Sequence, residues 1–173
     1  CHPESPLMLR FLSILIVLLT VTLGFNCSSN STEPQKIAVL TFDDAVQSHL
    51  DVVAPLLSEL GFGATFFVTH KWMADTANFM NWEDIAQLHE MGFEIGNHTW
   101  THADFAIPKN AARLAGELGL VDLELHYRGV PKPVSFAYTG NFFGPTTWQV
   151  LKENGIQFAR RGMQPEQPYG EIH

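Results

Sequence analysis

The segment Ile37-Ala-Val-Leu-Thr-Phe-Asp-Asp44 joins a short apolar run to two adjacent carboxylates. Its first six residues are apolar or β-branched, which is typical of a strand buried on both faces of a parallel sheet. The two aspartates would then lie just past the carboxyl end of that strand. The segment therefore predicts a strand over residues 37–42 and a polar site at one edge of the sheet.

Further short apolar runs follow, and helical patterns separate them. The predicted strands are residues 64–69, 93–97, 133–138 and 156–159, and the predicted helices are residues 52–60, 82–91, 108–125 and 145–153. Repeated alternation of strand and helix indicates a parallel α/β architecture, either a sheet or a barrel. Local signals support these boundaries: Asn81 and Asp84 form a capping-box pattern at one helix start, and Gly92 follows its end.

Polar residues follow several of the predicted strands. Asp43 and Asp44 follow the first strand, His70 follows the second, the segment 98–102 follows the third, and the segment 138–141 follows the fourth. In parallel α/β folds, ligands bind at the carboxyl ends of the strands. We therefore expect these side chains to lie on one rim.

The pair His98 and His102 has a spacing typical of metal ligands. Four residues apart in a helical turn, both imidazoles would lie on one side, within reach of one metal ion. A carboxylate from Asp43 or Asp44 would complete a His-His-Asp set with open positions for water, whose pKa the ion would lower. Simpler interpretations exist: surface or core histidines, and aspartates that cap a helix or form an Asx-turn. The strand-end position of both pairs favours the metal site.

Two motifs resemble a known family. Thr41-Phe-Asp-Asp44 and Glu94-Ile-Gly-Asn-His-Thr-Trp-Thr-His102 are similar to the first two motifs of the NodB-homology polysaccharide deacetylases, carbohydrate esterase family 4, over roughly residues 36–162. The resemblance implies a distorted (β/α) barrel of NodB-homology type, truncated at its C-terminal side in this chain. It also implies hydrolysis of acetyl groups on N-acetylglucosamine polymers such as chitin or peptidoglycan, or of O-acetyl groups on xylan.

The resemblance assigns roles to individual residues. Asp43 matches the general base, and Asp44, His98 and His102 match the ligands of a divalent metal ion, with zinc as the expected ion. Trp100, between the two histidines, would form a wall of the cleft or stack on a sugar, although packing against the adjacent loop explains it equally well.

The third motif departs from the family pattern. It falls at residues 136–140, where Ala137 stands in place of an arginine that orients the base. The arginine's role must then be absent or come from elsewhere. A backbone N–H near Gly140 would polarise the acetyl carbonyl, and Tyr138 is a further candidate substrate-binding residue. The fourth and fifth motifs, which supply the general acid, are not identified in the sequence.

The N-terminal part of the chain predicts export. Met8 and Arg10 precede a fifteen-residue uncharged run, residues 11–25, which is short for a membrane span and typical of a signal peptide. We therefore divide the chain into residues 1–7 upstream of Met8, a signal peptide at 8–26, a linker at 27–35 and a polysaccharide deacetylase domain at 36–173. Cys27 would be a lipid-anchoring cysteine or a free thiol in the linker.

The composition limits the partners. Ten Lys+Arg against eighteen Asp+Glu give a formal net charge of −8, which argues against a nucleic-acid partner. The expected partner is an N-acetylated polysaccharide or cell-wall glycan. Two alternatives stay open: a non-catalytic or truncated glycan-binding relative, which the unidentified last motifs favour, and a C–N hydrolase acting on cyclic amides, against which the predicted export argues.

Overall fold

A computed structural model describes residues 36–162 of the 173-residue chain, and the fold belongs to a compact unit that begins at Ala38. The predicted signal peptide, the linker and Cys27 lie outside the described residues. Among the helices of the described part, none is long and apolar enough to cross a membrane.

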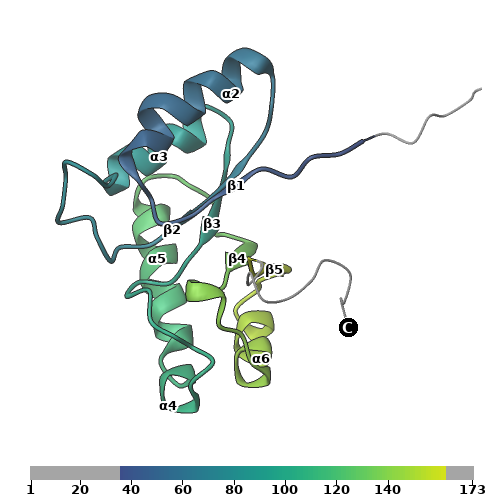
Figure 1. The fold of residues 1–173 in the computed structure, drawn as a ribbon. Coiled ribbons are helices and arrows are strands. Elements are labelled where there is room, and N and C mark those ends of the chain that lie inside the picture. The colour runs from purple at the N-terminus through teal and green to yellow at the C-terminus, as the bar shows by residue number, and fades with distance from the viewer. Residues whose placement is uncertain (1–35, 163–173) are drawn as a thin grey trace, which may run out of the picture. The chain divides into compact units, whose positions relative to one another are not determined.

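Five parallel strands form a single sheet in the order β1-β2-β3-β4-β5 (Figure 1). The strands are β1 (Thr41–Phe42), β2 (Thr65–Val68), β3 (Glu94–Asn97), β4 (Ser135–Ala137) and β5 (Phe158–Arg160). Neighbours in the sheet are also neighbours in sequence, and helices lie between them, which is the strand order of a (β/α) barrel. The predicted fold class is confirmed.

The helices differ from the predicted ones at two places. The predicted helix 52–60 begins earlier, because a π-helical turn η1 (His49–Val53) runs directly into α2 (Ala54–Leu60). The predicted helix 108–125 is instead two helices, α4 (Pro108–Ala111) and α5 (Leu114–Tyr127), separated by a turn at Ala112 and Arg113. The apolar residues that recur at helical spacing in this segment are nevertheless all buried: Ala111, Leu114, Leu118, Val121 and Leu125.

Two helices begin where the sequence predicts. The helix α3 (Trp82–Glu90) has the predicted capping box, in which Asn81 accepts from the backbone of Asp84 at 2.9 Å and Asp84 accepts from the backbone of Asn81 at 2.9 Å. The helix α6 (Pro145–Glu153) begins at its proline. A short 3-10 turn, η2 (Thr139–Asn141), follows β4.

The first strand is shorter than predicted. Only Thr41 and Phe42 form the strand. The Leu40 backbone oxygen still accepts from Thr65 N at 3.0 Å, but Val39 is 80% exposed, so the apolar character of residues 37–39 does not reflect burial in the sheet. The strand β5 also begins later than predicted and ends at Arg160 rather than Ala159. This difference matters for the functional site because it places a charged side chain at the carboxyl end of β5.

Gly96 in β3 leaves room for the aromatic ring of Phe67 on the neighbouring strand β2. A Cβ at this position would overlap the Phe67 ring and lie 2.9 Å from Ser135 Oγ. We therefore expect Gly96→Ala to lower the free energy of unfolding by about 1–3 kcal/mol, since overpacking forces neighbouring side chains to shift. Urea unfolding followed by circular dichroism measures this.

Gly119→Ala is the matched control for this substitution. Gly119 lies in α5, nothing lies within 4 Å of a Cβ placed there, and alanine favours the helix by about 0.5–1 kcal/mol. If Gly96→Ala were as stable as the wild type, the close approach of β3 to Phe67 would not be a constraint on the fold.

Candidate functional site

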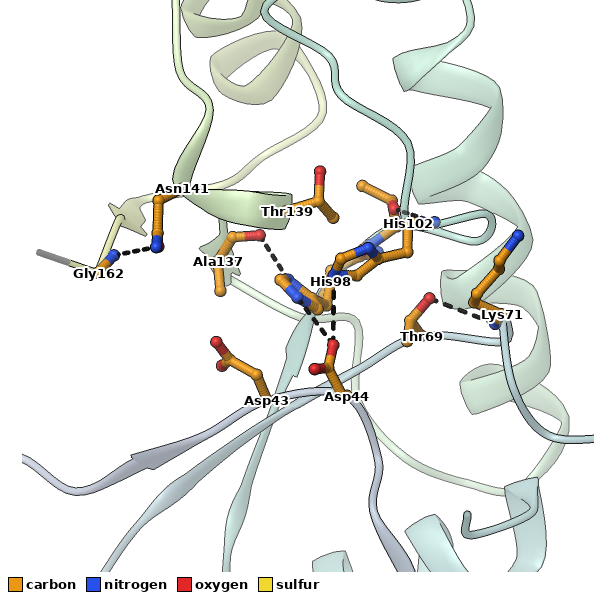
Figure 2. A network of polar contacts seen from close by, with 12 residues as sticks. Asp43, Asp44, Thr69, Lys71, His98, His102, Ala137, Thr139, Asn141 and Gly162 are labelled. Atoms are coloured by element: carbon orange, nitrogen blue, oxygen red, sulfur yellow. Dashed lines mark hydrogen bonds and ion pairs between the residues drawn. The ribbon is translucent and has the colours of Figure 1, made fainter. Parts of the chain in front are cut away.

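Three potential metal ligands converge at the carboxyl end of the sheet. Asp44 follows β1, and His98 and His102 follow β3. One ligand atom from each of the three residues lies within 4.8 Å of the others, and Figure 2 shows their side chains pointing toward one another. The structure thus brings together three of the residues that the sequence singled out.

Asp44 is the common neighbour of the two imidazoles. Its Oδ1 atom lies 3.4 Å from His98 Nε2 and 3.3 Å from His102 Nε2, yet this buried oxygen has no partner in hydrogen-bonding geometry. Burial by itself acts to raise the pKa of Asp44, but the close polar contacts and positive charges of His102 and His98 outweigh it and hold the pKa well below the usual range. The side chain is therefore a carboxylate, the form that binds a cation.

The His98 ring is held in a fixed orientation. Its Nδ1 lies 2.7 Å from the backbone oxygen of Ala137 (Figure 2), and the side chain is 2% exposed. A carbonyl oxygen only accepts, so Nδ1 carries a proton, and Nε2 is the nitrogen that faces Asp44. A metal-binding histidine usually has its second nitrogen fixed in this way. Nε2, which binds a metal ion in its unprotonated form, and the unpartnered Oδ1 of Asp44 together fit a divalent cation.

The turn that carries the two histidines is not helical, so the predicted helical turn is wrong. Thr99 and His102 have positive φ angles of 66° and 53°, which interrupt a right-handed helix. Side chains stabilise this strained turn instead: Thr99 N donates to Asn97 Oδ1 at 2.9 Å, and His102 N donates to Thr99 Oγ1 at 3.1 Å. The turn still brings both Nε2 atoms to one carboxylate oxygen.

Asp43, the predicted base, is bound by a residue that the sequence analysis missed. The Arg160 guanidinium donates to Asp43 Oδ1 from the carboxyl end of β5 and also lies over the Phe67 ring, 4.9 Å from its centroid. At Ala137, where the resemblance predicts an arginine, the backbone binds His98 instead. The arginine beside Asp43 therefore comes from the fifth strand.

Trp100 and Tyr138, two further candidates, mainly pack against neighbouring side chains. Trp100 stacks on His70 at 3.9 Å between ring centroids and on Trp82 at 5.8 Å, as its packing interpretation expects. Tyr138 is 8% exposed and packs edge-on against Phe136. Burial raises the pKa of the Tyr138 hydroxyl, and a hydrogen bond with Thr147 partly offsets this. The substrate-binding roles of Trp100 and Tyr138 stay predictions.

Gly140 and Trp72 lie near the same rim. Gly140 has a φ of 59° in the turn after β4, and its role in binding the acetyl oxygen also stays a prediction. Trp72, which the sequence analysis did not single out, tilts onto His102 with ring centroids 4.8 Å apart and stacks on Phe79 at 5.4 Å. Trp72 lies in the loop that follows the second predicted strand, and this position near a strand end could have marked it as a candidate.

Comparison with known proteins points to one family. The family model described as "Polysaccharide deacetylase" matches residues 30–159. A chitin deacetylase from Pestalotiopsis sp is 37% identical over 82 residues, which cover 43% of this chain and 24% of that protein. A bifunctional xylanase/deacetylase from Pseudobutyrivibrio xylanivorans is 29% identical over 93 residues, covering 54% of this chain and 15% of that protein.

A solved structure has the same fold. IcaB from Ammonifex degensii superposes with a TM-score of 0.65 at 25% identity, covering 73% of this chain and 60% of that chain. By contrast, this chain spans less than a quarter of the length of the chitin deacetylase and of the bifunctional xylanase/deacetylase. The family model matches most of the sequence, including both strand-end motifs, and the chain therefore belongs to the polysaccharide deacetylase family.

Proposed function

We propose that the protein is a metal-dependent hydrolase that removes acetyl groups from an N-acetylated polysaccharide such as chitin oligomers or peptidoglycan. The observation that carries the proposal is that a candidate metal site and a candidate general base lie next to each other at one rim of the sheet. Asp44, His98 and His102 present three ligand atoms within 4.8 Å, and the neighbouring Asp43 is held by Arg160.

Zinc is the ion that we propose for this site. Two imidazole nitrogens and one carboxylate oxygen are a ligand set that zinc accepts, and three protein ligands leave a position open, as in catalytic zinc sites. When bound, such an ion supplies Lewis acidity, which makes a water molecule more acidic and polarises a carbonyl. Iron, cobalt or nickel would accept the same ligands, so the metal is identified by analysis of the purified protein.

The residues of the chain supply the proton transfer. Asp43 lies next to Asp44 in the chain but contacts Arg160 rather than the histidines, so it is free of the ligand set and can accept a proton from the attacking water. Arg160 fixes the carboxylate for that transfer. The reaction adds one water across the amide: the C–N bond breaks, the acetyl group leaves as acetate, and the amine takes up a proton.

The relatives support a glycan as substrate. One is a chitin deacetylase and the other a bifunctional xylanase/deacetylase, so both N-acetylated glycans and acetylated xylan belong in the test. Because such polymers lie outside the cytoplasm, we also propose that residues 8–26 direct export of the protein. Cleavage after this segment would be measured by N-terminal sequencing of the secreted protein.

Acetate release tests the proposed activity. The full-length protein with added zinc is incubated with chitin oligomers, peptidoglycan and acetylxylan, and we expect acetate from at least one N-acetylated polymer. Removing the ion with a chelator should abolish release, and adding zinc back should restore it. Zinc binding without acetate from any of the three would contradict the proposal and favour the non-catalytic, glycan-binding alternative.

A further inference from the structure

The turn that carries His98 and His102 is attached to the helix α5. Thr101 N donates to Glu117 Oε2 at 2.8 Å, and Thr101 Oγ1 lies 2.7 Å from Glu117 Oε1 and 2.9 Å from Oε2. Asn97, at the start of the turn, donates from Nδ2 to the Leu118 backbone oxygen and to Asp122 Oδ1, both at 3.2 Å. The turn is therefore attached to one helix on both sides of Thr99.

Glu117 is a charged residue in a buried position. It is 6% exposed, and a buried carboxylate is costly unless its oxygens are hydrogen-bonded. Its cationic neighbour Arg113 is 56% exposed and lies 3.6 Å away, so solvent weakens that pair. The short contacts of Glu117 all go to Thr101, the residue that directly precedes His102.

The geometry points to Glu117 as a positioning residue of the metal centre, and this inference rests on the proposed metal site. By accepting from both the backbone and the hydroxyl of Thr101, Glu117 fixes the direction in which the chain enters His102. His102 needs this constraint because its own backbone is left-handed, with a φ of 53°, a conformation that a free turn would leave. Loss of Glu117 should therefore release His102 from Asp44.

Zinc affinity of the full-length protein tests the inference. We expect Glu117→Ala to weaken zinc binding by about 10- to 100-fold, the usual effect of removing a residue that orients a metal ligand. Glu117→Gln should stay within about threefold of the wild type, because the amide oxygen can accept from Thr101 N and the amide nitrogen can donate to Thr101 Oγ1. Competition with a chromophoric chelator measures the affinities.

Two further measurements separate positioning from general stability. The visible spectrum of the cobalt-loaded protein should change in Glu117→Ala, because the coordination geometry changes, and should be unchanged in Glu117→Gln. Glu124→Ala is the matched control: this residue also lies on α5 and is ion-paired, but its carboxylate contacts Arg128 at 2.7 Å rather than Thr101. It should keep wild-type zinc affinity.

The outcomes are distinguishable. Wild-type zinc affinity in Glu117→Ala, with or without a lower melting temperature, would overturn the positioning role, as would equal losses in the Ala and Gln variants. If Glu117→Ala does not fold, Thr101→Val replaces it, because it removes the hydroxyl and keeps the backbone donor: weaker zinc binding supports the role and unchanged binding overturns it. A wild-type protein that binds no zinc would instead reject the proposed metal site.

Discussion

Replacing His98 by alanine is expected to lower the zinc affinity of the protein by about 100-fold or more. Zinc sites with four protein ligands bind with about 10–16 kcal/mol, so each ligand contributes about 2.5–4 kcal/mol. His98 is also the ligand with the most constrained orientation, because its Nδ1 is bonded to Ala137 and its side chain is 2% exposed. Metal analysis after dialysis, together with acetate release, measures the effect.

A matched control exists for the His98 substitution. His126 lies exposed at the end of α5, and His126→Ala should retain wild-type metal content and activity. Circular dichroism of the metal-free variants shows whether His98→Ala still folds, which separates loss of the ion from loss of the fold. A folded His98→Ala protein with unchanged zinc content would remove His98 from the ligand set.

Asp43→Asn is expected to lower kcat by about 10²- to 10⁴-fold, the usual contribution of a general base, while zinc content stays unchanged. Arg160→Ala should lower kcat by about 10²-fold, because the carboxylate loses the contact that orients it. In the double variant we expect no loss beyond that of Asp43→Asn alone, since Arg160 acts through Asp43. Steady-state kinetics of all four proteins completes the cycle.

Arg161→Ala is the control for the arginine. The Arg161 guanidinium lies over the Phe143 ring, 4.3 Å from its centroid, and the side chain is exposed. This variant should keep kcat within about twofold. Losses that add in the Asp43/Arg160 double variant would show that Arg160 acts on the reaction independently of Asp43, and a fall in zinc content of Asp43→Asn would place Asp43 among the ligands.

Most of the proposed metal centre could be predicted from sequence because it depends on local patterns. The first and third strands end at Phe42 and Asn97. Parallel strands bring their carboxyl ends to one rim, so Asp44 and His98 had to lie close together. The spacing of His98 and His102 then limited the second imidazole to the same region. The strands and the helix caps were predictable for the same reason, since their signals lie within a few residues.

The parts that the sequence did not predict depend on tertiary contacts or on backbone strain. The turn at residues 98–102 has two non-glycine residues with positive φ, which spacing alone cannot indicate. Arg160 lies 117 residues from Asp43 in the chain, and no local pattern connects them. A signal did exist. Position 137 holds alanine where the resemblance implies an arginine, so another arginine could have been sought. Arg160 directly follows the predicted fifth strand, and a residue at the carboxyl end of a strand is expected on the rim.

The contact between Asp43 and Arg160 has a consequence for biosynthesis. Asp44, His98 and His102 are all translated well before Arg160, so the nascent chain contains all three proposed metal ligands before it contains the partner of Asp43. Translation proceeds at about 5–20 residues per second, which leaves seconds in which the ion can bind an immature chain. We therefore expect a ribosome-stalled chain that ends before β5 to bind zinc without releasing acetate.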